Sequence, residues 1–231
     1  MGNESIEFAI ATDTNTTEPQ VEYPDVKPTL EGKVQPNASD PFYTIPTIGL
    51  PEPDGKMTYI MDSRKIANAL EERYPSPSLH LDSPTLSKLE AIMPRMTNSL
   101  VDLFILAVPT VILNPVSSEY WHGTRSKWVG GMPLKEFVES RGGDDRAFAE
   151  MKPLVGEVTA LLKEKPEGPF FEGKEVSYAD FVWAGLLLFV KACGEEKYEG
   201  MLEKAVGGGE DAKLHRDLLE ALKPWWERSD H

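Results

Sequence analysis

The chain has 231 residues, of which 40% are apolar, enough for the core of one large domain or two modest ones. Its 24 basic and 38 acidic side chains give a formal net charge of −14, which argues against nucleic acid or an anionic membrane as a partner. One cysteine, no signal-peptide pattern and no apolar run longer than ten residues favour a cytoplasmic protein without disulfides or membrane spans.

Composition divides the chain into three stretches. Residues 21–77 are rich in proline, threonine and β-branched side chains, and residues 84–231 show one helical pattern after another. Between them lies "YPSPSLHLDSP", in which residues 78–83 are predicted to link two domains. Residues 1–20 form an atypical N-terminal segment, in which "SIEFAIAT" is a strand candidate and "DTNTTEPQ" has the composition of turn and coil.

The first domain is predicted to hold a hairpin and one short helix. The runs "FYTIPTI" (42–48) and "KMTYIMD" (56–62) flank an Asp-Gly pair, a strong turn signal, and predict two antiparallel strands. Apolar residues then recur at helical spacing from Ile66 onward, with Asp62 or Ser63 as the N-cap.

The second domain is predicted to be all helical. Ser83 and Pro84 open a helix with one apolar face, and Pro153 is expected as the first residue of a later helix. The segment 108–131 holds prolines, glycines and two tryptophans and is expected to be less regular. A last helix is expected over about 211–222.

Ser177 and Asp180 form an S-x-x-D capping box ahead of "FVWAGLLLFV". This run is apolar almost all round, which predicts a buried helix. Cys193 at its end is expected to be a packed small side chain and not a nucleophile.

Common catalytic and metal-binding motifs are absent from the sequence. It contains no G-x-x-x-x-G-K-[ST], G-x-G-x-x-G or C-x-x-C, and the four histidines lie far apart and are expected at surface or capping positions, so no metal site is predicted. These histidines are His80, His122, His215 and His231.

One group of residues, around Pro46 and the start of the following helix, has the chemistry of a ligand-binding site. A proline in a strand, here Pro46, favours a cis peptide bond that turns the Ile45 backbone toward a ligand. The helix beginning at Ser63 presents unpaired N–H groups that suit a carboxylate, and Asp62 can accept from an ammonium group. The plain alternative is an edge-strand proline beside an ordinary capped helix.

The run "TIPTI…MTYIMDSRKIANALEERYP" resembles the glutathione-binding, thioredoxin-like domain of cytosolic glutathione transferases. "GKEVSYADFVWAGLLL" is similar to the capping-box region of their all-helical C-terminal domain, and "VEYPDVKPTL" with "SDPFYTIPTI" resembles the fungal etherase-related class. The resemblance covers about residues 21–231 and implies an α/β thioredoxin-like domain followed by an all-α domain.

The resemblance implies a role for each matching residue. Pro46 would be the cis-proline, Ile45 would pair its backbone with the cysteinyl unit of glutathione, and Asp62 with Ser63 would hold the γ-glutamyl amine and carboxylate. Ser177 and Asp180 would be structural. These are implications of the resemblance and not of spacing.

The N-terminal segment departs from the family pattern. The family places a strand, a loop and a helix before "VEYPDV", and that loop carries the residue facing the glutathione sulfur. Twenty residues are too few for such a unit, so the first domain is expected to be incomplete, as in a truncated or spliced form, and to leave apolar surface uncovered on one face of its sheet. No thiol-activating residue is assigned, and the candidates by proximity are Ser5, Thr12, Thr14, Thr16 and Thr17.

If intact, such a site lowers the pKa of the bound thiol, and the thiolate attacks an electrophile. The resemblance thus implies a cytoplasmic detoxifying transferase, expected as a homodimer, that acts on aromatic electrophiles. Tyr120, Trp121 and Trp128 are candidate pocket residues, with core positions as the alternative. Two rival interpretations are a non-catalytic scaffold that binds glutathione or a protein, and a helical interaction module without glutathione affinity.

Overall fold

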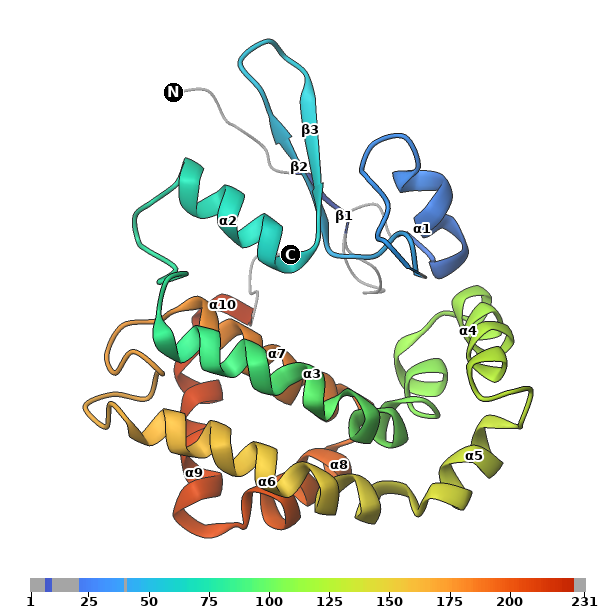
Figure 1. The fold of residues 1–231 in the computed structure, drawn as a ribbon, viewed down its shortest axis with the longest axis vertical. Coiled ribbons are helices and arrows are strands. Elements are labelled where there is room, and N and C mark those ends of the chain that lie inside the picture. Colours follow the sequence, from blue (N-terminus) through green and yellow to red (C-terminus); the bar gives the residue numbers. More distant parts are fainter. Residues whose placement is uncertain (1–6, 10–20, 40, 227–231) are drawn as a thin grey trace. The chain divides into compact units, whose positions relative to one another are not determined.

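The structure, a computed structural model, describes residues 7–9, 21–39 and 41–226. Its contacts divide the chain into two compact units, drawn with the whole fold in Figure 1. Unit 1 holds residues 1–77 and 113–121, and unit 2 holds residues 78–112 and 122–231. The sequence placed residues 113–121 in the helical domain, whereas the structure groups them with the first unit.

Unit 1 contains a three-stranded antiparallel sheet in the order β1 (Glu7–Ala9), β2 (Thr47–Pro51), β3 (Met57–Met61). The predicted hairpin is confirmed, since β2 and β3 pair from Thr47↔Met61 to Pro51↔Met57. Gly55 takes a φ of 82° in the turn, a conformation that favours glycine. The predicted strand in "SIEFAIAT" is confirmed as β1, while "DTNTTEPQ" lies outside the described residues.

Two helices of unit 1 pack on opposite faces of this sheet, α1 (Tyr23–Leu30) and α2 (Ser63–Arg73) (Figure 1). Val26 and Leu30 of α1 pack with Met61. Ile66 of α2 packs with Ile48 and Leu50. The sequence predicted only the second helix. Tyr23-Pro24 fits a helix start, because the N–H that proline lacks has no partner in the first turn anyway.

Two expectations about the sheet are corrected. Pro46 does not interrupt a strand: β2 begins at the next residue, Thr47, so the ladder loses no donor. Ile48 and Leu50, which face α2, are 1% and 4% exposed, so these β2 side chains do not form the bare apolar face that was predicted.

Unit 2 is helical, as predicted. Its elements are α3 (Pro84–Phe104), the π-helix η1 (Val108–Ile112), the end of α4 (Pro115–Trp128), α5 (Leu134–Arg141), α6 (Gly143–Lys163), α7 (Tyr178–Cys193), α8 (Glu195–Gly200), the π-helix η2 (Met201–Val206), α9 (Gly209–Ala221) and α10 (Lys223–Trp226). No helix among the described residues is long and apolar enough to cross a membrane.

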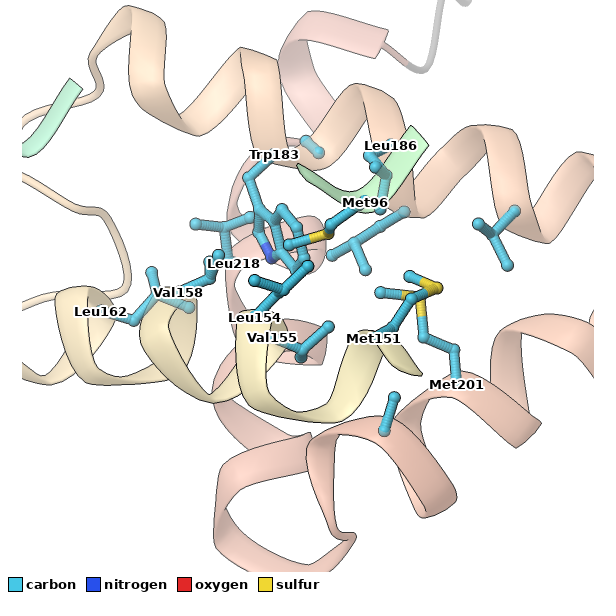
Figure 2. Close-up of a cluster of buried hydrophobic side chains, with 14 of the residues drawn as sticks. Met96, Met151, Leu154, Val155, Val158, Leu162, Trp183, Leu186, Met201 and Leu218 are labelled. Atoms are coloured by element: carbon cyan, nitrogen blue, oxygen red, sulfur yellow. The ribbon is translucent and has the colours of Figure 1, made fainter. Parts of the chain in front are cut away.

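The core of unit 2 forms where α3, α6, α7, η2 and α9 meet (Figure 2). Trp183 of α7 is fully buried at its centre, with Met96, Met151 and Leu218 around it. The predicted helix starting at Pro84 is confirmed, with Ser83 as its N-cap.

Two predictions for unit 2 are wrong. Pro153 lies inside α6, which begins ten residues earlier at Gly143, because Ala147, Phe148 and Met151 extend the buried face upstream of the proline. The segment 108–131 is mostly helical and contains η1 and α4.

Candidate functional site

The loop leading into β2 holds the predicted cis peptide bond between Ile45 and Pro46. Thr44 donates its backbone N–H to Met61 Sδ at 3.2 Å, and the Thr47 hydroxyl donates to the Thr44 carbonyl at 3.1 Å. Within the described part of the chain, neither the N–H nor the C=O of Ile45 has a hydrogen-bond partner. This backbone position can therefore pair with a ligand.

Asp62 caps α2, which settles the choice between the two predicted N-cap residues. Its Oδ1 accepts from the backbone N–H groups of Arg64 at 3.0 Å and Lys65 at 3.2 Å. Its φ of 90° is rare for a residue other than glycine and costs on the order of 1–3 kcal/mol. Such a conformation is concentrated at functional sites.

The remaining polar atoms at this helix start are exposed. Asp62 and Ser63 are both accessible to solvent, and among residues 7–9, 21–39 and 41–226 neither Asp62 Oδ2 nor the Ser63 hydroxyl has a hydrogen-bond partner. The N–H groups and dipole of a helix N-terminus favour a carboxylate, and Asp62 Oδ2 can accept from an ammonium group.

A direct hydrogen bond joins these two features: the Asp62 N–H donates to the Pro46 carbonyl at 3.3 Å. An open backbone donor and acceptor thus stand beside groups for an ammonium and a carboxylate where the chain enters and leaves the β2–β3 hairpin. This arrangement suits a small peptide that carries an α-amino acid at one end.

The three predicted pocket aromatics are not equivalent. Trp121 is 4% exposed and meets Tyr23 edge-on, at 5.9 Å between ring centroids, so its side chain lies in the interior of unit 1. Tyr120 stacks on the same Tyr23 at 6.4 Å but keeps 42% of its surface exposed. Trp128 belongs to unit 2 and stays 54% exposed, with the Arg125 guanidinium over its ring at 3.8 Å from the centroid.

A polar network that the sequence did not predict ties residues 113–121 into unit 1. The Tyr23 N–H donates to Ser117 Oγ at 2.8 Å, and the Ser117 hydroxyl donates to Glu22. Asn114 Nδ2 donates to the other oxygen of Glu22 at 2.7 Å. Because these partners are more than ninety positions apart, no local sequence signal could have revealed them.

The capping box of α7 is present as predicted. Asp180, fully buried, accepts from the Ser177 N–H and hydroxyl, both at 2.7 Å, and from the Phe171 N–H at 2.9 Å. Burial raises the pKa of this carboxyl, against the opposing effect of these hydrogen bonds. Its contacts are all structural.

Other predicted groups give no further site. The five hydroxyls considered for thiol activation (Ser5, Thr12, Thr14, Thr16, Thr17) lie outside the described residues. Among the residues that are described, no three His, Cys, Asp or Glu side chains come together as metal ligands. Cys193 is buried, and burial raises the pKa of its thiol to about 11, which suits a packing role.

Comparisons with known proteins agree with this reading of the fold. The family model for the glutathione S-transferase C-terminal domain matches residues 89–225. The glutathione S-transferase-like protein ustS of Aspergillus flavus is 30% identical over 220 residues, which cover 89% of this chain and 76% of that protein.

Solved structures show the same fold. A glutathione S-transferase of Ceriporiopsis subvermispora, crystallised in complex with glutathione, matches with a TM-score of 0.75 and 23% identity, covering 98% of this chain and 99% of that one. The glutathione transferase GSTFuA3 of Phanerochaete chrysosporium matches with a TM-score of 0.63 and 22% identity, over 87% of this chain and 81% of that one. The narrower resemblance to the etherase-related class stays a prediction.

The family model covers more than half of the chain, and the relative from Aspergillus flavus aligns over most of it. The chain belongs to the glutathione S-transferase family.

Proposed function

We propose that this protein is a glutathione transferase that binds glutathione through unit 1 and uses its thiolate to conjugate or cleave aromatic electrophiles. Ile45 pairs its backbone with the cysteinyl unit, Asp62 Oδ2 accepts from the γ-glutamyl ammonium group, and Ser63 donates to the γ-glutamyl carboxylate. Glutathione acts as a co-substrate.

One observation carries this proposal. The open Ile45 backbone and the open Asp62 and Ser63 groups are held together by the 3.3 Å hydrogen bond from the Asp62 N–H to the Pro46 carbonyl. A γ-glutamyl peptide has the amide, ammonium and carboxylate groups that these positions complement. The Ceriporiopsis subvermispora enzyme of similar fold, which was crystallised with glutathione, supports the same ligand.

We propose Tyr120 of unit 1 and Trp128 of unit 2 as separate candidates for contact with the electrophile, because each keeps about half of its surface exposed. Trp121 is proposed as a packing residue, since it is buried against Tyr23. A homodimer remains a prediction of the family resemblance, and light scattering on the purified chain tests it.

A non-catalytic protein that binds glutathione is the second candidate. It needs only the open Ile45 backbone and the exposed Asp62 and Ser63 groups, and no group that activates the thiol. The two candidates share the glutathione site and differ only in turnover.

Calorimetric titration with glutathione tests the shared site. The wild-type chain is expected to bind in the micromolar to low millimolar range, and the double variant Asp62→Ala/Ser63→Ala is expected to lose binding while unit 2 stays folded. Asp62→Asn is the sharper variant: asparagine caps a helix as well as aspartate and tolerates a positive φ, but it lacks the charge for the ammonium group.

Asp25→Ala, an exposed carboxylate of α1, is the matched control and is expected to bind like the wild type. Retained affinity in the double variant would refute the assigned site. Turnover of an aromatic halide by a chain that binds glutathione supports the transferase, and binding without turnover supports the second candidate.

A further inference from the structure

The loop that presents Ile45 is held by a side chain that the proposed function does not use. Thr47, the first residue of β2, is 1% exposed, and its hydroxyl reaches back over Ile45 and Pro46 to donate to the Thr44 carbonyl at 3.1 Å. The sequence reads Thr-Ile-Pro-Thr at this point, so one threonine stands on either side of the Ile45-Pro46 pair.

We infer that Thr47 is a positioning residue for the glutathione site, which sets the direction of the Ile45 backbone through its hydrogen bond to Thr44. This inference rests on the proposed function.

Three contacts fix the ends of this short loop. On its N-terminal side, Thr44 is held by the Thr47 hydroxyl and by Met61 Sδ, which accepts from the Thr44 N–H at 3.2 Å. On its C-terminal side, the Pro46 carbonyl accepts from the Asp62 N–H at 3.3 Å. Because a thioether is a weak acceptor, the hydroxyl-to-carbonyl bond is the strongest of the contacts on Thr44.

The position of Thr47 explains why its effect should reach the ligand. It pairs with Met61 in the sheet register, one residue before Asp62. Its side chain is buried, so it does not touch a ligand itself. It can act on affinity only through the orientation of Ile45, and a displaced backbone pair weakens binding steeply because hydrogen bonds depend on angle.

Two substitutions separate positioning from folding. Thr47→Val keeps the branched shape that suits a strand and removes the hydroxyl, whereas Thr47→Ser keeps the hydroxyl and removes a methyl group. Thr58→Val, at an exposed threonine on the neighbouring strand β3, is the matched control.

The measurement combines calorimetric titration with glutathione, the melting temperature, and the backbone amide NMR signal of Ile45 with and without glutathione. Thr47→Val is expected to raise the Kd about five- to tenfold and to reduce the glutathione-induced shift of the Ile45 amide. Thr47→Ser is expected to restore affinity to near wild type, and Thr58→Val to leave both readouts unchanged.

Equal affinity of Thr47→Val and wild type overturns the inference, as does a Thr47→Ser variant that binds as poorly as Thr47→Val. A Thr47→Val chain that melts earlier but binds normally also overturns it, because the hydroxyl would then serve stability alone. A wild-type chain that binds no glutathione overturns the proposed function itself, and the inference with it.

Discussion

His215 occupies a closed polar niche between Thr159 and Trp183, where the sequence predicted a surface or capping histidine. Trp183 Nε1–H donates to its Nδ1 at 2.8 Å. The Thr159 hydroxyl donates its proton to the Val155 carbonyl, so at 2.9 Å it accepts from His215 Nε2–H. Both nitrogens are satisfied in the neutral ring, whereas protonation would place an Nδ1–H donor against the Trp183 Nε1–H donor.

This niche predicts a dependence of stability on pH. Burial lowers the pKa of His215 from 6.5 to about 4, although the charge of Asp211 partly opposes the shift. The unfolded chain takes up the proton near pH 6.5 and the folded chain only near pH 4, so stability is lost as pH falls through this window. The loss amounts to roughly 3 kcal/mol.

Urea unfolding at pH 7 and pH 4 measures this loss of stability. Because His215→Gln removes the titrating group, its stability should fall by roughly 3 kcal/mol less than that of the wild type over the same interval. His122→Gln, at an exposed histidine, should behave as the wild type does. Equal losses in wild type and His215→Gln would contradict the prediction. The buried Asp180, whose pKa is raised, acts in the opposite direction in all three chains.

Asp180 itself gives a second prediction for a single residue. It accepts hydrogen bonds from Phe171 and Ser177, and so joins the start of α7 to the loop before it. Asp180→Ala leaves buried donors unpaired and should cost about 1–3 kcal/mol, seen as a lower melting temperature. The exposed Glu136→Ala should leave the melting temperature unchanged. An unaltered melting temperature in Asp180→Ala would argue against its structural role.

The helices and strands that could be predicted from the sequence are those whose apolar or turn pattern is complete within one local stretch. The apolar face of α3, the all-round apolar α7 and the β2–β3 hairpin each carry their signal within one local stretch. The start of α6 was predicted wrongly at Pro153, because a proline costs about 3 kcal/mol in a helix interior and the local sequence therefore favours it in the first turn. Contacts from other helices outweigh this cost, since Met151 and Val155, on either side of Pro153, are fully buried.

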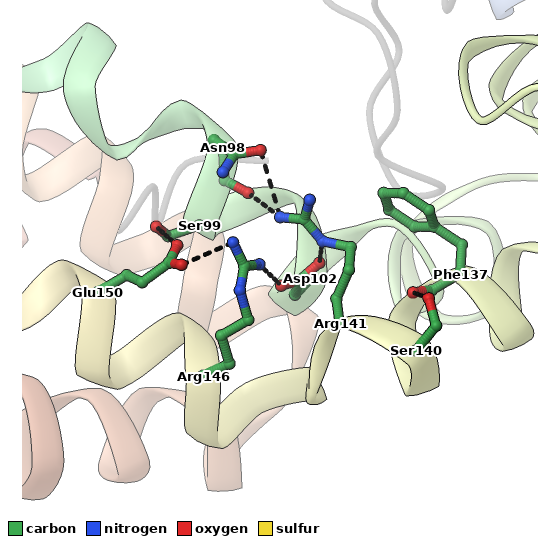
Figure 3. A network of polar contacts seen from close by, with 8 residues as sticks. All are labelled: Asn98, Ser99, Asp102, Phe137, Ser140, Arg141, Arg146 and Glu150. Atoms are coloured by element: carbon green, nitrogen blue, oxygen red, sulfur yellow. Dashed lines mark hydrogen bonds and ion pairs between the residues drawn. The ribbon is translucent and has the colours of Figure 1, made fainter.

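The charged network around Asp102 gives a test at the scale of helix packing (Figure 3). This carboxylate of α3 is fully enclosed and binds Arg141 of α5 at 2.7 Å and Arg146 of α6 at 2.6 Å. Asp102→Asn would leave a neutral group between the two guanidinium groups, of which, among the described residues, only Arg146 keeps another acidic partner, Glu150 at 2.6 Å. The expected loss of unfolding free energy is about 3 kcal/mol, measured by urea titration.

The pair Arg95–Glu157 serves as its comparison, because it also joins α3 to α6, with contacts of 2.9 and 3.0 Å, but about half of each side chain is exposed. Glu157→Gln should cost less than about 1 kcal/mol. If both substitutions lower the free energy of unfolding by the same amount, burial does not explain the contribution of the Asp102 network to stability.

Across the whole molecule, the residues proposed to bind glutathione followed from the sequence. The hairpin register pairs Thr47 with Met61, and one step further along it Pro46 meets Asp62, so the predicted turn already implied that these residues are neighbours. The grouping of residues 113–121 with unit 1 could not be predicted, because it depends on Glu22, Ser117 and Asn114 meeting across the chain.

The two units differ in the size of their cores. Among the described residues, unit 2 has one continuous apolar cluster drawn from six elements, whereas unit 1 has two small clusters on the two faces of its sheet. Less buried apolar area means a smaller stabilisation. Unit 1 should therefore unfold at a lower urea concentration than unit 2, and the chain should not behave as a two-state system.

Tryptophan fluorescence can observe this order, because the five tryptophans are unequally divided. Trp121 is the one in unit 1, where it is buried against Tyr23, and the other four lie in unit 2. A fluorescence change is expected before the main loss of helical circular dichroism. Trp121→Phe should remove that early change, and Trp128→Phe, at an exposed position of unit 2, should not. Glutathione at a hundred times its Kd should stabilise the early transition by about 2.7 kcal/mol and leave the later one in place. A single transition, coincident by both probes, would mean that the two units unfold together and that the small core of unit 1 draws its stability from the rest of the chain.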